Sequence, residues 1–154
     1  MASSPLAVAN YFTELNGGRA MSNMKVQKLC YLGYAWYLAV KNETLFSGGF
    51  EAWDGGPVSR DLYRETIHGN MSWGYFCDKD KNILKEGLGD EEHALLRAVW
   101  DRYGDMSGQE LSDLTHQPGT PWTETYFKQG RNAIIPDELI KSHFTQLAHA
   151  GREQ

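Results

Sequence analysis

The stretch Phe50–Tyr63, FEAWDGGPVSRDLY, decides much of the fold of this 154-residue chain. An aromatic-rich segment that ends at Trp53 runs into two glycines and then into Pro57. Glycine allows the backbone of a sharp turn, and proline has the φ angle of a first helical residue. The pattern therefore predicts an extended segment, a turn, and a helix from Pro57 to His68. The aromatic side chains before the turn need a surface to pack against.

Residues 24–40 supply that surface as the predicted central helix. Apolar side chains recur there at i, i+3, i+4 and i+7, and more apolar residues lie on the opposite side. Ser22 or Asn23 can cap its start. A helix that is apolar on nearly every side is surrounded by other elements. Its first two turns also carry a polar side that we expect to face outward, formed by Lys25, Gln27 and Lys28.

The rest of the chain reads as shorter helices with one hairpin. Helical spacing and capping signals predict helices at 6–15, 90–103, 122–129 and 137–149, with Ser4 or Ser3 capping the first and Asp90 the second. Ser107 and Glu110 form a capping box for another helix. Two short runs, Tyr75–Cys77 and Asn82–Leu84, resemble a hairpin. The expected fold is mainly α (α+β), a compact bundle of about six to seven helices with a short β-hairpin or small antiparallel sheet.

Composition is that of one ordinary domain. Hydrophobic residues make up 41% and charged residues 23%, and we expect a single domain over 1–154 with its core at about 6–148. The net charge of -5 argues mildly against a protein whose main task is to bind nucleic acid. The sequence shows no signal peptide and no apolar run of about 18 residues, so we expect a cytoplasmic protein.

Catalytic and cofactor motifs are absent from the sequence. The five histidines form no HExxH pair, the two cysteines form no CxxC, and the glycines match no nucleotide-binding pattern. We therefore expect no catalytic residue, no metal and no cofactor, and the protein is not expected to be an enzyme. An alternative is a small hydrolase that uses His116 with a carboxylate such as Asp113. The preferred interpretation is that His116 caps the end of a helix.

A basic cluster offers a further alternative. Five cationic residues lie around the second and third predicted helices, namely Arg19, Lys25, Lys28, Arg60 and Arg64. They could meet an acidic partner protein or phosphate, or they could simply be solvated. A nucleic-acid-binding domain through these cations stays open as an alternative function.

Four segments carry a family resemblance. They are MKVQKLCYLGYAWYLA (24–39), FEAWDGGPVSRDLY (50–63), ELSDLTHQPGTPW (110–122) and IIPDELIKSHF (134–144). In this order they closely resemble the Panacea domain family, also described as SocA-like or phage-associated GepA-like. The resemblance extends from about Ala7 to Phe144.

The resemblance implies a binding module. Members look like antitoxins of bacterial and phage two-component loci, which bind a cognate toxin protein, encoded by an adjacent gene, and block it. One class of members delivers its toxin to the ClpXP protease. A phage member that uses the same surface against a host protein is an alternative.

The candidate site residues, most of them in the family's motifs, divide into two groups here. Structural roles are expected for Glu51, Trp53, Gly56, Pro57, Val58, His116, Pro121 and Trp122, with both tryptophans in the core and Gly56-Pro57 starting a helix. Partner binding is expected for Lys25, Gln27, Lys28, Arg60, Tyr63 and Arg64, because packing explains the first three poorly and the others follow the turn on an outward face.

Overall fold

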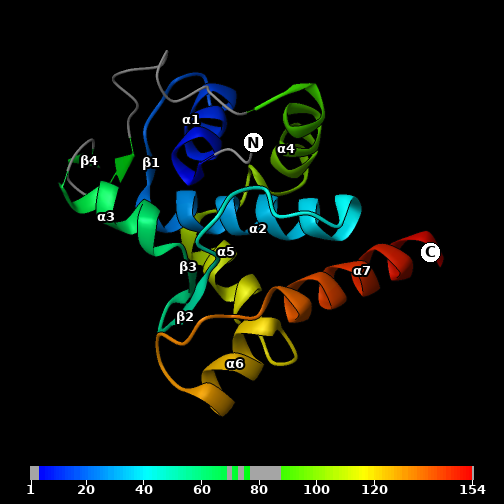
Figure 1. Cartoon of the computed structure of the whole chain (residues 1–154). Coiled ribbons are helices and arrows are strands. Elements are labelled where there is room, and N and C mark those ends of the chain that lie inside the picture. Colours follow the sequence, from blue (N-terminus) through cyan, green and yellow to red (C-terminus); the bar gives the residue numbers. More distant parts are fainter. Residues whose placement is uncertain (1–3, 69–70, 73–74, 77–87, 154) are drawn as a thin grey trace.

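Helix α2, Asn23–Lys41, runs through the middle of the molecule, and the other elements are arranged around it (Figure 1). The computed structural model describes residues 4–68, 71–72, 75–76 and 88–153. Seven helices lie in this described part, which confirms the mainly α fold with small antiparallel sheets. The other elements are α1 (Pro5–Leu15), β1 (Met21–Ser22), β2 (Glu51–Trp53), β3 (Gly56–Val58), α3 (Arg60–His68), β4 (Met71–Ser72), β5 (Tyr75–Phe76), α4 (Asp90–Tyr103), α5 (Gly108–Thr115), α6 (Pro121–Gln129) and α7 (Asp137–Glu153).

The side chains of α2 explain its central position. The Ser22 hydroxyl caps the helix by accepting a hydrogen bond from the backbone N–H of Lys25 at 3.2 Å. Residues 26–35 are all buried, and α1, α4, α5 and α7 each contact the helix. The prediction that other elements surround this helix is therefore confirmed.

Aromatic rings fill the space between α2, the chain before β2, and α7. Tyr31 and Tyr34 contact the ring of Phe50 edge-on, at centroid distances of 5.2 and 5.3 Å. Phe144 of α7 lies 6.0 Å from Tyr31. All four rings are almost completely buried. Aromatic pairs in this geometry add stabilisation to that from the apolar area that they bury. The segment before the turn is therefore firmly held to the helix.

The segment FEAWDGGPVSRDLY forms a hairpin before it forms a helix. Strands β2 and β3 are antiparallel, with Pro57 opposite Ala52. The prediction that Pro57 starts a helix is therefore wrong. Helix α3 begins at Arg60, and the Ser59 hydroxyl accepts a hydrogen bond from the N–H of Leu62 at 3.3 Å. The φ angle of proline also fits an edge strand, where its missing N–H does no harm.

The other edge of β2 pairs with residues just before α7. The N–H of Ala52 donates to the carbonyl of Ala133 at 2.8 Å, and the N–H of Ile135 donates to the carbonyl of Phe50 at 2.8 Å. The hairpin thus gains a third, short extended segment. It ties the first third of the chain to the last helix.

A second small sheet has the strand order β1–β5–β4. The prediction that Tyr75 and Phe76 are extended is confirmed, because they form β5, which pairs with β1 and β4. The second run predicted for that hairpin, Asn82–Leu84, lies outside the described residues.

Helix ends follow the predicted capping signals with one shift. The capping box of Ser107 and Glu110 is present at α5, and Ser4 caps α1. At α4 the N-cap is Gly89, and Asp90 is already helical. Because Asp90 lies in the first turn, its carboxylate still faces the positive end of the helix dipole.

Gly33 allows α1 and α4 to approach α2 closely. A Cβ atom at this position would lie 2.7 Å from Cδ2 of Leu96 and 3.7 Å from the ring of Phe12. Overpacking costs about 1–3 kcal/mol, whereas alanine gains about 1 kcal/mol in helix propensity over glycine. We expect Gly33→Ala to lower the free energy of unfolding by about 1 kcal/mol, as measured by urea denaturation.

Gly55→Ala is the matched control, because a Cβ atom there would meet no heavy atom within 4 Å beyond its own chain neighbours. This variant should stay within about 0.5 kcal/mol of the wild type. Equal stability of the two variants would show that the contact with Leu96 relaxes without cost.

Candidate partner-binding surface

Strand β2 has one buried and one open side. Ala52 is buried, and Glu51 and Trp53 point the other way because successive side chains of a strand alternate. Ile134 pairs directly opposite Glu51, so its side chain shares this open side. Ile134 is 67% exposed, which is unusual for a large aliphatic residue beside a strand. The open side therefore combines an aromatic ring, a carboxylate and an exposed aliphatic side chain.

Arg60 at the start of α3 is fixed over this side. Its guanidinium makes two hydrogen bonds to the Glu51 carboxylate, each at 2.9 Å, and lies 5.6 Å from the ring centre of Trp53. The Trp53 indole N–H donates to the same carboxylate at 2.9 Å. The hydrogen bonds from Arg60 hold the pKa of the Glu51 carboxyl below its usual range, so the pair stays charged at neutral pH. Such surface pairs add little stability, and their main effect is to fix the orientation of Arg60.

The next turn of α3 extends the surface. The ring of Tyr63 meets Trp53 edge-on at 4.7 Å, and Tyr63 is 38% exposed. Arg64 pairs with Asp61 and keeps most of its side chain in solvent. We call this surface the Trp53 face, and its residues are Glu51, Trp53, Arg60, Tyr63, Arg64 and Ile134.

Helix α6 supports the Trp53 face from behind. The Trp122 indole N–H donates to the carbonyl of Trp53 at 2.6 Å. The Tyr126 hydroxyl donates to Oδ1 of Asp54 at 2.8 Å, and Arg131 forms an ion pair with Asp54 at 2.8 Å. Three groups from one end of the molecule thus hold the turn of the hairpin. The surface is built on a rigid support.

The two tryptophans of the predicted structural set have different positions. Trp122 is 6% exposed and belongs to the core, as predicted. Trp53 is half-buried and lies on the surface, so the prediction that it fills the core is wrong. The reason is strand alternation, which directs Ala52 inward and Trp53 outward.

The residues predicted to bind a partner separate into two groups. Arg60, Tyr63 and Arg64 come together on the Trp53 face. Lys25 lies elsewhere, since its ammonium donates to the carbonyl of Gly104 at 2.6 Å at the end of α4. The structure thus gathers the three residues from α3 and places Lys25 apart from them.

The prediction that Gln27 and Lys28 face outward is wrong. They are only 5% and 3% exposed. The Gln27 amide pairs with the backbone of Ser59, donating to its carbonyl at 3.1 Å and accepting from its N–H at 2.9 Å. The Lys28 ammonium donates to the carbonyl of Pro57 at 3.0 Å. Both side chains hold the end of β3 and the start of α3 against α2, and so they position the Trp53 face.

Burial changes the acidity of Lys28. Desolvation lowers the pKa of its ammonium from 10.5 to about 8. Gly56 lies directly above it with φ +116°, and a Cβ there would come within 3.0 Å of the Lys28 Cε. Glycine is therefore needed at position 56, where the backbone has a positive φ angle and the turn passes close over a buried lysine.

His116 lies at the end of α5, where its Nδ1 contacts the carbonyl of Ser112. This geometry matches the interpretation of a helix cap. The Ser112 hydroxyl donates to the carbonyl of Gly55 at 2.5 Å, so its proton is already engaged. Asp113 accepts a hydrogen bond from Gln109 at 2.9 Å. These contacts give no support to a hydrolase built from His116 and Asp113.

The predicted basic cluster does not form a free cationic face. Lys28 is buried, and Arg60 and Arg64 pair with Glu51 and Asp61. A nucleic-acid site would need exposed cations that contact successive phosphates.

The described part of the chain offers neither a metal site nor a membrane span. No group of three or more His, Cys, Asp or Glu side chains there is placed to hold a metal ion. No helix there is both long enough and apolar enough to cross a bilayer.

Sequence reasoning missed Ile134. The run Ile134-Ile135-Pro136 indicates by itself only a lead into the last helix. In the structure Ile135 is 1% exposed and Ile134 is 67% exposed, which is the alternation of a strand. Two residues are too short a pattern to predict a strand, and the pairing with β2 could not be seen from the sequence.

Comparison with known proteins identifies the family. The model of the family described as Antitoxin SocA-like, Panacea domain, matches residues 26–123. The chain is 30% identical over 136 residues to Antitoxin SocA of Caulobacter vibrioides (strain NA1000 / CB15N), a match that covers 80% of this chain and 72% of the relative. No solved structure matches this chain. Since the family model spans more than half of the residues and includes both the hairpin and α5, the chain belongs to the Antitoxin SocA-like, Panacea domain family.

Proposed function

We propose that this protein is an antitoxin that neutralises a partner toxin by direct contact, and that the toxin covers the Trp53 face. Membership of the antitoxin family supports the role. The observation that favours this surface is the exposed apolar Ile134 on the side of the strand that carries Trp53, with Tyr63 against Trp53 and two arginines at the edge. Aromatic and arginine side chains dominate the energetics of protein interfaces.

Rigidity supports the same surface. Arg60 is held by two hydrogen bonds to Glu51, and the carbonyl of Trp53 is held by Trp122. Side chains that are fixed before binding lose less conformational entropy when the partner arrives. The Trp53 face therefore offers a preorganised contact for a partner protein.

Co-expression tests the function itself. The product of the neighbouring gene is the toxin to test, because antitoxins of this kind are paired with a toxin in one locus. We expect that product alone to stop growth, and co-expression of this protein to restore growth and to give a complex that co-purifies. A neighbour that is neither toxic nor bound would remove the proposal.

Two substitutions test the surface. We expect Ile134→Asp and Arg64→Glu each to raise the Kd for the toxin by about tenfold or more. The first substitution buries a carboxylate in the apolar part of the interface, and the second reverses a charge at its edge. Isothermal titration calorimetry with the purified toxin measures this change.

Val40→Asp is the matched control, since Val40 is 61% exposed on α2 and lies outside the Trp53 face. It should bind the toxin with the affinity of the wild type. If Ile134→Asp and Val40→Asp bind equally well, the toxin covers another surface.

Delivery of the toxin to ClpXP is a finer role that family membership suggests. The co-expression experiment separates it from simple blocking. Blocking leaves the lifetime of the toxin unchanged, whereas delivery shortens that lifetime only in cells that contain ClpX.

A further inference from the structure

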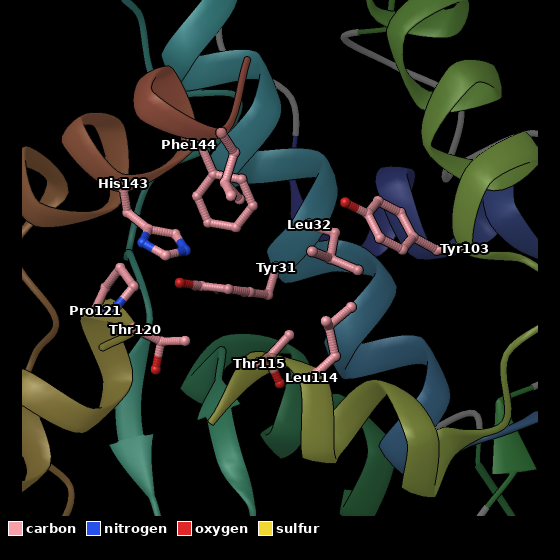
Figure 2. Close-up of a pocket in the computed structure, with 10 residues that line it drawn as sticks. Tyr31, Leu32, Tyr103, Leu114, Thr115, Thr120, Pro121, His143 and Phe144 are labelled. Carbon is pink, nitrogen blue, oxygen red and sulfur yellow. The ribbon is translucent and has the colours of Figure 1, made fainter. Parts of the chain in front are cut away.

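A small cavity lies between α2, α5, the start of α6 and α7 (Figure 2). Its volume is about 60 Å³, and most of its lining is apolar. Leu114 and Thr115 of α5 form one wall, and His143 and Phe144 of α7 form the opposite wall. None of the roles assigned above uses this cavity.

The Tyr31 hydroxyl points into this cavity without a partner. Tyr31 is 1% exposed, and its hydroxyl oxygen makes no hydrogen bond in the structure. Figure 2 shows the hydroxyl directed toward the space between the imidazole of His143 and Pro121. Buried polar atoms nearly always have a partner, so an unpaired hydroxyl facing a cavity indicates a missing one.

His143 supplies a second polar group to the same space. Partial burial lowers the pKa of its imidazole, which favours the neutral ring. A neutral imidazole has one N–H donor and one nitrogen acceptor. The cavity therefore presents an O–H group and a ring nitrogen among apolar side chains, which suits a short apolar group with a hydrogen-bonding tip.

The cavity lies close to the surface, because Leu147, one of its lining residues, is 41% exposed. A neighbouring hollow of about 200 Å³ shares Thr120, Pro121 and His143 with it and is lined by polar side chains of α6 and α7. The inner space holds only a few heavy atoms. A free molecule of that size makes too few contacts for tight binding, whereas a side chain carried by an already docked protein needs no separate association step.

We infer that the cavity receives one side chain of the toxin, short and apolar with a polar tip, as in threonine. The tip bonds the Tyr31 hydroxyl and the His143 ring. This inference rests on the proposed function and adds a second contact point to the Trp53 face. Tyr31 lies within the family-matched residues 26–123, whereas His143 lies in α7 beyond them.

Tyr31→Phe is the main test, with the neighbouring gene's product as the toxin. This substitution removes only the unpaired hydroxyl and keeps the ring contacts with Phe50 and Phe144. We expect the free variant to melt at a higher temperature than the wild type, because a buried unpaired group is lost. We expect its Kd for the toxin to rise about tenfold or more. Opposite effects on stability and binding distinguish a contact residue from a merely structural one.

Leu147→Trp provides a second variant that does not alter the hydroxyl. Leu147 lines the cavity and is 41% exposed, so a larger side chain there should obstruct entry without disturbing the core. We expect at least tenfold weaker toxin binding. Val40→Trp, with the same added ring at an exposed position of α2, should bind like the wild type.

Several results would overturn the inference. A Tyr31→Phe protein that is less stable than the wild type would show that the hydroxyl is already satisfied by water. Unchanged toxin binding by both Tyr31→Phe and Leu147→Trp would show that no toxin side chain enters. If Ile134→Asp weakens binding in the same experiments, the proposed function stands and only this inference fails. A wild-type protein that binds no toxin removes both.

Discussion

Replacing Gln27 by leucine is expected to lower the free energy of unfolding by roughly 2–6 kcal/mol, although the two side chains are similar in size. The Gln27 amide satisfies both the N–H and the carbonyl of Ser59, in a region where both residues are buried. Leucine leaves these two backbone groups without partners, and each unpaired buried group costs about 1–3 kcal/mol. Urea denaturation followed by circular dichroism measures the change.

Gln109→Leu is the control for this prediction. Gln109 is exposed on α5, and its side-chain amide donates to the carboxylate of Asp113 on the same helix. Its replacement should alter the free energy of unfolding by no more than about 0.5 kcal/mol. Similar losses for Gln27→Leu and Gln109→Leu would mean that water reaches Ser59 and replaces the amide.

Loss of Gln27 should also affect the Trp53 face. Ser59 directly precedes Arg60, so its anchoring fixes where α3 begins. Once Ser59 is released, the position of Arg60 over Trp53 is no longer set by α2. The variant is therefore expected to bind the toxin more weakly even at temperatures where it stays folded.

The contribution of Lys28 to the stability of the protein is expected to rise with pH. Burial lowers the pKa of this lysine from 10.5 to about 8 in the folded protein. Between these values the unfolded chain binds a proton that the folded protein has lost, so raising the pH favours the folded state. The cost of burying the charged Lys28 ammonium is fully present below about pH 8 and disappears by about pH 10.5. Between pH 7 and pH 10 the gain is roughly 2–3 kcal/mol.

The measurement compares the wild type with Lys28→Met at each pH. Burial raises the pKa values of Cys30 and Tyr31, so the folded state keeps those protons longer and loses stability as the pH rises through the alkaline range. These groups occur in both proteins, and their effects cancel in the difference. We expect the stability of Lys28→Met relative to the wild type to fall by roughly 2–3 kcal/mol from pH 7 to pH 10.

Lys41→Met provides the control for charge removal. Lys41 lies at the surface end of α2, and its hydrogen bond to Glu91 raises the pKa of its ammonium. A raised pKa gives no gain in stability between pH 8 and pH 10. A constant difference between Lys28→Met and the wild type over this range would show that Lys28 stays charged inside the fold.

Helices were predictable wherever the signals are local. The periodicity of α2, the capping hydroxyl of Ser22 and the capping box of Ser107 with Glu110 all lie within a few residues of the structure that they specify. Each acts through i to i+3 or i+4 contacts, which are fixed once the helix forms. The family resemblance likewise depends on short ordered segments, and the family model confirms it.

The turn in FEAWDGGPVSRDLY was only partly predictable. Asp54-Gly55 is a dipeptide typical of two-residue hairpin turns, and it could have indicated that β2 and β3 pair. Pro57 gave the competing signal of a helix start. The φ angle of proline suits both structures, and the pairing of Pro57 with Ala52 settles the choice.

The candidate site depended on contacts that no local pattern contains. Gln27 meets Ser59 across 32 residues, and Ile134 joins a strand formed more than 80 positions earlier. A polar side chain on a helix is expected in solvent unless a distant backbone group is brought to it.

The sequence by itself determined most of the helices and caps, and the family, because these follow from periodicity and short motifs. Only the tertiary structure decided which polar residues support the fold and which remain for a partner. Burial is a property of the whole packed chain, and folding brings Ser59 and Pro57 over Gln27 and Lys28 while leaving Arg64 in solvent. The physical cause is that a buried donor or acceptor must be paired, and its partner is chosen by the packing of α2, β3 and α3.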